Sequence, residues 1–323
     1  MRQGRQDLAS NKVNRHEQRN HSSLSRLGSR SNQPINLKNG KQRVDNSRIM
    51  TSSTSSSKRL IQRRRLDARV TGNLQDVLVT QPVWDLVELN ASSKLCLRLL
   101  EVLSHCTHVQ TLILMDPCEA VQQFLAEWLE NAPSTLATID HVSVRNGTIA
   151  TVTTAEALRD GFSSHSCRVT HLELCDVALA SWNVVQSIAK GLGSLQRLTK
   201  LSLRSCHLED QEVALLLQSL QHHVPLTDLC LSRNYCQEQG TMALAEILTC
   251  PTTSLQILDL SNQETWDDRR YYQHLARALS NRHCLLQELN LASNFVHDGQ
   301  FIDLLNALGG ESNNTHLKTL NLR

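Results

Sequence analysis

Three side chains near the middle of the sequence have the types that ligate metal ions: Cys167, His171 and Cys175. The apolar pattern around them predicts a β-strand that contains both His171 and Cys175, four positions apart. Strand residues advance about 3.3 Å each, so these two side chains would be separated by roughly 13 Å. Ligands of one zinc ion lie roughly 4 Å from each other. The pair therefore cannot share an ion, and the sequence predicts no metal site and no cofactor.

Nucleophilic catalysis would need a cysteine or serine beside a histidine base. The chain has ten cysteines and 14 histidines, and no single pair is distinguished by its surroundings. The signatures of phosphate-binding loops, dinucleotide sites, zinc proteases and serine hydrolases do not occur in the sequence. Gly191 and Gly193 are explained as the cap that ends a helix. We expect no enzymatic activity and no small-molecule substrate.

The elements that must position these residues are set by a repeated pattern, Leu-x-x-Leu-x-Leu. Its eight copies begin 28 to 31 residues apart. A fixed period of this size predicts a solenoid, in which each unit buries its apolar face against its neighbours. Five copies are clean and begin at Leu198, Leu226, Leu255, Leu286 and Leu317, and three weaker ones begin at Val109, Ile139 and Val169.

Each copy predicts a strand followed by a helix. Motif positions two apart share one face of a strand, which the following segment must cover. After the copy at Leu198, acidic residues from Glu209 to Glu212 favour a helix N-terminus. A stripe of apolar residues at helical spacing comes next: Val213, Leu216, Leu217 and Leu220. The predicted fold is an α/β solenoid, a horseshoe arc of about eight to nine repeats with parallel inner strands and outer helices.

This pattern resembles the leucine-rich repeat family, and its period resembles the ribonuclease-inhibitor-type repeats. In that family an Asn or Cys follows each strand and satisfies backbone groups of the turn. The predicted structural ladder consists of the residues in this slot, Cys206, Asn234 and Asn294. The other copies have Pro117, Gly147, Val177 and Gln263 there. Asn146 and Asn262 stand one position earlier, which indicates a register slip in two repeats. The resemblance covers residues 109–323.

Charge divides the chain into two segments. Residues 1–71 contain 17 Lys or Arg and 4 Asp or Glu, and residues 72–323 contain 16 and 27, so the net charges are +13 and −11. The first segment has few large apolar residues, so we predict a disordered basic tail at 1–71 and a repeat domain at 72–323. Residues 72–108 are predicted as an N-terminal cap, with a strand at 74–79 and a helix at 86–103. The last copy ends without a following helix, which predicts an open C-terminal end.

A basic cluster follows the Ser-rich stretch of the tail: Lys58, Arg59, Arg63, Arg64 and Arg65. One interpretation is a nuclear-import or nucleic-acid patch. The alternatives are a solvated linker and a tail that touches the acidic repeat domain. The tail has no aromatic residue, so base stacking is not available there.

The sequence shows no signal peptide and no apolar stretch long enough to span a membrane. Its ten cysteines have no C-x-x-C pairing and favour a reducing compartment. We therefore expect a cytoplasmic or nuclear protein that is not secreted and does not bind a membrane.

Side chains that point away from the core form the predicted binding surface. The basic members are Lys200 and Arg204, and the acidic members, on three successive strands, are Asp228, Asp259 and Glu288. The ring-bearing members directly follow the slot and would line one rim: His207, Tyr235 and Phe295. We predict that these eight residues bind a partner. The alternatives are a solvated face and rings that pack over the turns.

The resemblance implies a non-enzymatic module that binds a protein partner, because the family includes ribonuclease inhibitors and the sensor halves of intracellular immune receptors. The chain contains no P-loop, so it would not switch by ATP. One alternative is a GTPase activator, since Ran-directed activators also resemble this repeat type. Arg204 and Arg233 are then the candidates for stabilising charge. Another alternative is association with nucleic acid through the basic tail.

Overall fold

The structure is a computed structural model of the 323-residue chain. It describes residues 83–87, 98, 109–131, 139–221, 225–263, 269–309 and 316–323. These residues all belong to one compact unit, Leu60–Arg323. The predicted tail, with its cluster Lys58–Arg65, lies outside the described residues, so its disorder stays a prediction.

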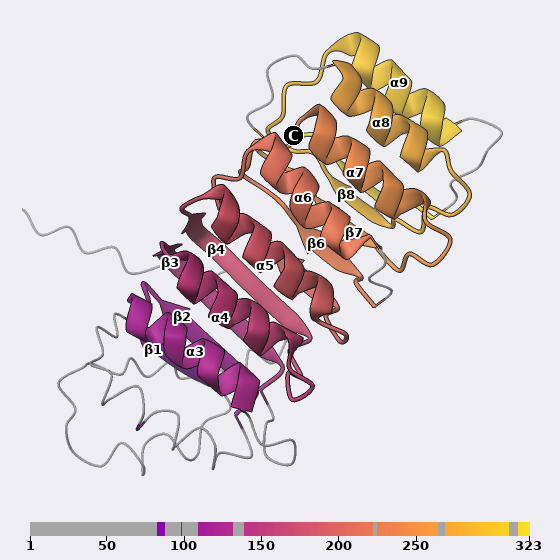
Figure 1. The fold of residues 1–323 in the computed structure, drawn as a ribbon. Helices are drawn as coiled ribbons and strands as arrows, with labels where there is room; N and C mark the ends of the chain where they lie inside the picture. Colours follow the sequence, from indigo (N-terminus) through magenta and orange to yellow (C-terminus); the bar gives the residue numbers. More distant parts are fainter. Residues whose placement is uncertain are drawn as a thin grey trace, which may run out of the picture. The chain divides into compact units, whose positions relative to one another are not determined.

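Nine parallel strands form one open sheet in the described residues, and they are ordered in space as in the sequence (Figure 1). The strands are β1 (Val83–Val87), β2 (Thr111–Met115), β3 (His141–Ile149), β4 (His171–Leu179), β5 (Lys200–Ser202), β6 (Asp228–Cys230), β7 (Ile257–Asp259), β8 (Glu288–Asn290) and β9 (Thr319–Asn321). Each strand pairs in parallel with the next, so a polypeptide crossover returns the chain to the same end of the sheet every time.

The crossovers from β2 onward contain helices, which cover one face of the sheet (Figure 1). They are α3 (Glu119–Asn131), α4 (Val152–Ser163), α5 (Trp182–Ser194), α6 (Asp210–Leu220), α7 (Glu238–Thr249), α8 (Arg269–Leu279) and α9 (Asp298–Gly309). The predicted solenoid of parallel strands alternating with helices is confirmed.

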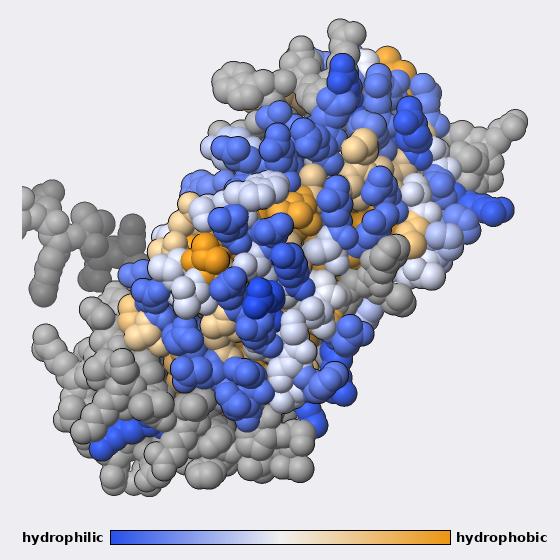
Figure 2. Space-filling view, in the orientation of Figure 1, coloured by the Kyte–Doolittle hydropathy of each residue, from blue (hydrophilic) through white to orange (hydrophobic). Residues whose placement is uncertain are grey.

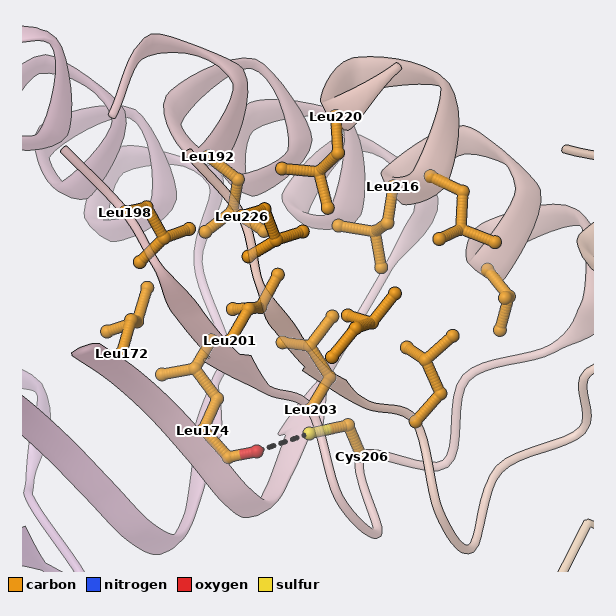
Figure 3. Close-up of a cluster of buried hydrophobic side chains, with 14 of the residues drawn as sticks. Leu172, Leu174, Leu192, Leu198, Leu201, Leu203, Cys206, Leu216, Leu220 and Leu226 are labelled. Atoms are coloured by element: carbon orange, nitrogen blue, oxygen red, sulfur yellow. Dashed lines mark hydrogen bonds between the residues drawn. The ribbon is translucent and has the colours of Figure 1, made fainter. Parts of the chain in front are cut away.

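The core lies between the sheet and the helices and is built largely from the repeated leucines. Leu201 and Leu203 of one repeat lie in the same buried cluster as Leu216 and Leu220 of the helix that follows (Figure 3). All four side chains are at most 2% exposed. This packing buries the apolar face that the motif spacing creates. The burial of that apolar surface is the main contribution that holds neighbouring repeats together.

The helix α6 begins as its sequence predicts. Glu209 is the N-cap, and its side chain and that of Glu212 form a capping box with each other's backbone N–H groups. The predicted apolar stripe is buried against the sheet: Val213, Leu216, Leu217 and Leu220. Acidic residues at this end also favour the helix dipole.

The first strand in the described residues, β1, overlaps the start of the helix predicted at 86–103. β1 pairs with β2 so that Trp84 stands beside Leu112 and Leu86 beside Leu114, 28 positions apart. Leu86, the predicted start of a helix, is therefore in a strand, and residues 74–79 lie outside the described residues. The motif is obscured here because Gln81 occupies its first position and Trp84 its second.

Gly191 and Gly193 do not form the predicted cap. Both lie inside the last turn of α5, and the cap position that follows the helix is Leu195. A Cβ atom on Gly191 would stand 2.9 Å from Arg159 Cα, and one on Gly193 would stand 2.7 Å from the Ser219 carbonyl oxygen. The glycines therefore allow α5 to approach α4 and α6 closely, rather than ending the helix.

The outer, helical face of the repeats is mostly hydrophilic. Figure 2 shows hydrophobic residues on this face as scattered spots within a polar surface. In the described residues, none of the helices has the length and apolar character needed to cross a membrane.

Candidate functional site

In each of the seven repeats from β2 to β8, one residue lies in the left-handed backbone region at the same repeat position. These residues have φ between 49° and 58° and are Asp116, Asn146, Asp176, Ser205, Arg233, Asn262 and Ser293. The N–H of Ser205 donates to the Ser232 carbonyl, and that of Arg233 donates to the Ser261 carbonyl, both at 3.0 Å. Each turn is thus tied to the next repeat, and these side chains form a row along one edge of the solenoid.

Asn234 joins two repeats by its side-chain amide, which is 1% exposed. Its Oδ1 accepts from the N–H groups of Cys206 and Leu208, both at 3.1 Å. Its Nδ2 donates to the carbonyls of Leu203 at 2.8 Å and Leu231 at 2.9 Å. One side chain thereby satisfies four buried backbone groups, each of which would otherwise cost stability.

The neighbouring slots use other side chains for the same purpose. Gln263 accepts from the Cys236 N–H at 3.0 Å and donates to the Leu231 carbonyl at 2.7 Å. Asn294 accepts from the Gln263 N–H and donates to the Leu260 carbonyl, both at 2.7 Å. The ladder therefore continues through Gln263.

Cys206 completes this ladder through its thiol, which donates to the Leu174 carbonyl at 3.0 Å (Figure 3). Burial raises the pKa of the Cys206 thiol to about 12 and also raises the pKa of Cys236. Thiols that stay protonated are poor nucleophiles and poor metal ligands, so both cysteines are structural.

The register slip expected at Asn146 and Asn262 is wrong. Both asparagines occupy the left-handed turn position, with φ of 51° and 58°, where asparagine is tolerated better than most residues. Gly147 and Gln263 remain in the slot. In the early repeats Gln122 substitutes for a slot side chain, and its Nε2 donates to the Pro117 and Thr148 carbonyls, both at 3.0 Å.

The predicted rim residues line one pocket. His207, Tyr235 and Phe295 surround it together with the left-handed turn residues, and its volume is about 610 Å³. The complete lining is Asp176, Ser205, His207, Arg233, Asn234, Tyr235, Asn262, Gln263, Ser293 and Phe295. We call this the rim pocket. Its lining includes the left-handed turn residues of five repeats, and its rings come from the position two residues further on.

The Phe295 side chain is exposed to solvent, while its backbone carbonyl is held by a hydrogen bond. The residue is 71% exposed, the largest value among the exposed large hydrophobic residues in the described part of the chain. Its carbonyl accepts a hydrogen bond of 3.1 Å from the Tyr272 hydroxyl. Tyr235 is half-buried, and its N–H donates to the Leu208 carbonyl at 2.9 Å. The predicted alternative, rings packed over the turns, does not apply to Phe295.

Charged side chains on the sheet face opposite the helices pair with one another at β3 and β4. Glu173 accepts from Ser143 Oγ at 2.8 Å and Arg145 Nη2 at 2.9 Å. His141 Nε2 lies 3.5 Å from its other oxygen. Contact with His141, and then with Arg145 and Ser143, lowers the pKa of Glu173 to about 2, against the opposite effect of burial.

The basic and acidic groups predicted further along this face partly neutralise each other. Lys200 and Asp228 are register partners on β5 and β6, and Lys200 Nζ lies 3.3 Å from Asp228 Oδ1. Asp259 accepts from Asn290 Nδ2 at 3.0 Å. Glu288 and Arg204 are exposed. The two predicted charged features therefore meet, which sequence spacing alone did not indicate.

Relatives of known sequence contain the same repeats. The chain is 36% identical over 115 residues to the mouse (Mus musculus) NACHT, LRR and PYD domains-containing protein 5, which covers 36% of this chain and 10% of that protein. It is 34% identical over 162 residues to the human (Homo sapiens) NACHT, LRR and PYD domains-containing protein 13, covering 48% of this chain and 14% of that protein. No profile of a known protein family matches the chain.

The repeats are leucine-rich repeats. This identification rests on the repeat period, the strand-to-helix crossovers and the slot ladder, together with the similarity to relatives whose names include such repeats. The chain matches only 10% and 14% of the length of these two relatives, so their other domains have no counterpart in the match.

Two solved structures match the chain at low sequence identity and low TM-score. The C-terminal domain of tropomodulin from Caenorhabditis elegans is 15% identical, with a TM-score of 0.34, over 48% of this chain and 91% of that one. The TLR13–ssRNA13 complex is 15% identical, with a TM-score of 0.41, over 77% of this chain and 30% of that one.

Trp182 was not singled out by the sequence analysis. It begins α5 and is 47% exposed, and Val152, at the equivalent position of α4, is 37% exposed. The signal in the sequence is their 30-residue spacing, together with their position outside the buried stripe that begins at Val184. Both lie where strands lead into helices, the same edge of the leucine-rich repeats that contains the rim pocket.

Metal-ligating side chains do not converge in the described part of the leucine-rich repeats, where no group of three or more His, Cys, Asp or Glu could hold an ion. His171 Nδ1 lies 2.8 Å from the Thr170 hydroxyl, and Cys175 Sγ lies 3.6 Å from the Ser202 hydroxyl. His171 and Cys175 are thus both engaged by neighbouring hydroxyl groups.

Proposed function

We propose that this leucine-rich repeat domain is a non-enzymatic module that binds a protein partner through the rim pocket. The observation that carries the proposal is the exposed Phe295 ring beside Tyr235 and Arg233 in one pocket of about 610 Å³. Aromatic residues and arginine dominate the energetics of protein interfaces. A large aromatic ring that is exposed to water is energetically unfavourable unless a partner covers it.

The chemistry elsewhere on the repeats supports binding rather than catalysis. A general base works best when its pKa lies near the working pH, and the pKa of Glu173 is about 2. The Ser143 hydroxyl donates to that same carboxylate. The buried thiols of Cys206 and Cys236 have raised pKa values, so they supply no thiolate. These groups stabilise the sheet face and its turns.

The geometry gives no support to the two alternative functions, GTPase activation and association with nucleic acid. Arg204 and Arg233 lie on neighbouring turns, but their placement adds no feature specific to GTPase activation. Association of nucleic acid with the cluster Lys58–Arg65 concerns residues outside the described part of the chain, and it stays a prediction.

A capture experiment with surface variants tests the proposal. The full chain, Phe295→Ala and two controls would each be immobilised and exposed to the same cell lysate. The controls are Met242→Ala on α7, which is 46% exposed, and Glu288→Ala on the opposite sheet face. We expect one or more proteins that bind the full chain and both controls but are lost with Phe295→Ala. Partners that depend on Glu288 and not on Phe295 would contradict the rim proposal.

A further inference from the structure

The rim pocket is elongated across the strands. Its lining begins at Asp176, within β4, and ends at Phe295, after β8, so it extends over five consecutive repeats. Neighbouring strands lie about 4.8 Å apart, so four spacings give a length of roughly 19 Å. An extended polypeptide advances about 3.3 Å per residue, so the pocket matches about six residues.

The lining of the rim pocket offers hydrogen-bonding groups at a regular interval. Each of the five repeats contributes its left-handed turn residue, and these are Asp176, Ser205, Arg233, Asn262 and Ser293. Hydroxyl, amide and guanidinium groups in such a row can satisfy the N–H and C=O groups of an extended backbone. The rings of Tyr235 and Phe295 stand beside this row and offer apolar contact.

Charge in the rim pocket selects the partner's chemistry. Arg233 is exposed near the middle of the row and forms no ion pair within the described residues. Asp176 lies at one end, so the pocket has one arginine and one carboxylate, with His207 between them in the repeat order. A nucleic-acid backbone would need several cations along this length. One arginine instead suits one carboxylate, which it can bind with two parallel hydrogen bonds.

We propose that the rim pocket takes an extended acidic segment of a partner protein, about six residues long. A carboxylate of the segment binds Arg233, and an apolar side chain of the segment packs against Phe295 and Tyr235. This inference rests on the proposed function and adds to it the conformation and charge of the bound segment.

The test is a selection from random seven-residue peptides displayed on phage, with the full chain immobilised. We expect enriched peptides to contain Asp or Glu close to an aromatic or branched apolar residue. Selection against Arg233→Glu should replace the acidic preference by Lys or Arg, whereas Lys190→Glu, an exposed change on α5, should leave it unchanged. A synthetic acidic peptide should bind Arg233→Glu at least roughly tenfold more weakly than it binds the full chain.

Three results would overturn the inference. They are a library without any enriched motif, an acidic motif that Arg233→Glu leaves unchanged, and Arg233-dependent binding of a single-stranded oligonucleotide in place of peptides. The proposed function fails separately, if lysate partners do not depend on Phe295. Lysate partners that depend on Phe295 without an acidic peptide motif would keep the function and remove only the extended-segment inference.

Discussion

Two adjacent tyrosines show how much a single hydroxyl can differ in its surroundings. Tyr271 and Tyr272 are both at most 1% exposed and meet edge to face, with ring centroids 4.7 Å apart. The Tyr272 hydroxyl donates to the Phe295 carbonyl, while the Tyr271 hydroxyl is buried without a hydrogen-bond partner among the described residues. Burial raises the pKa of both phenols, so neither ionises near neutral pH.

Removing the two hydroxyls should therefore have opposite effects on stability. Tyr271→Phe should leave the free energy of unfolding unchanged or raise it by up to about 1 kcal/mol, because a buried unpaired polar group is lost. Tyr272→Phe should lower it by about 0.5–1.5 kcal/mol, because a partly buried hydrogen bond is lost. Urea unfolding of both variants measures the difference. Equal losses would show that the Tyr271 hydroxyl has a partner after all.

Glu173 should make stability depend on acid pH. Its pKa is about 2 in the folded chain, below its ordinary value of 4.5. A lowered carboxyl pKa stabilises the fold above pH 4.5, and that contribution is lost as the pH falls from 4.5 towards 2. Glu173→Gln should lose less stability over this interval than the unchanged chain does. Identical pH profiles from urea unfolding would contradict the Glu173 contacts with Arg145 and His141.

At the scale of elements, an aspartate of one helix caps the next helix. Asp210 begins α6, and its carboxylate accepts from the N–H groups of Gln237, Gln239 and Gly240 at the start of α7, at 2.7, 2.9 and 2.8 Å. Asp210→Ala should destabilise the domain by about 1–3 kcal/mol, since three helix-end donors lose their acceptor.

Glu238→Ala is the matched control for this cap. Glu238 also lies in the first turn of α7, but it forms an exposed ion pair with Arg270, so its loss should cost less than about 1 kcal/mol. Thermal unfolding followed by circular dichroism would rank the two variants. A larger loss for Glu238→Ala would mean that the carboxylate of Asp210 does not cap α7.

Close helix packing predicts opposite outcomes for two glycine substitutions. A Cβ on Gly193 would stand 2.7 Å from the Ser219 carbonyl oxygen, whereas a Cβ on Gly299 in α9 would meet nothing within 4 Å. Gly193→Ala should destabilise by about 1–3 kcal/mol, because α5 and α6 must move apart. Gly299→Ala should stabilise by about 0.4–1 kcal/mol, because the unfolded chain loses freedom. Urea unfolding in which both variants gained stability would disprove the close approach of α5 and α6.

The sequence was sufficient for most elements because one residue type carried the pattern. The spacing of Leu198, Leu201 and Leu203 predicts a strand and its buried face. In the next repeat Leu229 is 1% exposed, as the same register requires. The pattern failed at β1, where Gln81 and Trp84 replace the expected leucines. It also missed Gly193, whose role depends on a helix 26 residues further along the chain.

The candidate site was partly predictable for a similar reason. His207, Tyr235 and Phe295 share a repeat position, so the sequence predicted that they would line one edge, and the structure places them around one pocket. The pairing of Lys200 with Asp228 and the exposure of Trp182 depend on side-chain directions, which a repeat period does not specify.

At the scale of the whole molecule, the two charge segments should behave as separate parts. Residues 1–71 have a net charge of +13 and few apolar residues, so limited trypsin digestion should cleave first within the tail, up to the cluster Lys58–Arg65. A fragment that contains the leucine-rich repeats should resist, since its strands and helices bury their leucines. Mass spectrometry of early fragments checks this. A tail that survives while the repeats are cut would contradict the predicted division.

The hydrogen bonds between neighbouring repeats determine which insertions and deletions the fold can tolerate during evolution. Asn234 reaches the preceding repeat at Cys206 and Leu208, and Asp210 reaches the following helix at Gly240. These bonds join immediate neighbours, so a duplicated or deleted period of 28 to 31 residues would change the junction at its border and leave the other junctions intact. Insertion or deletion of whole repeats is therefore the way in which this surface can be lengthened or shortened. A deletion of a few residues within one repeat would instead disrupt its junctions with both neighbours.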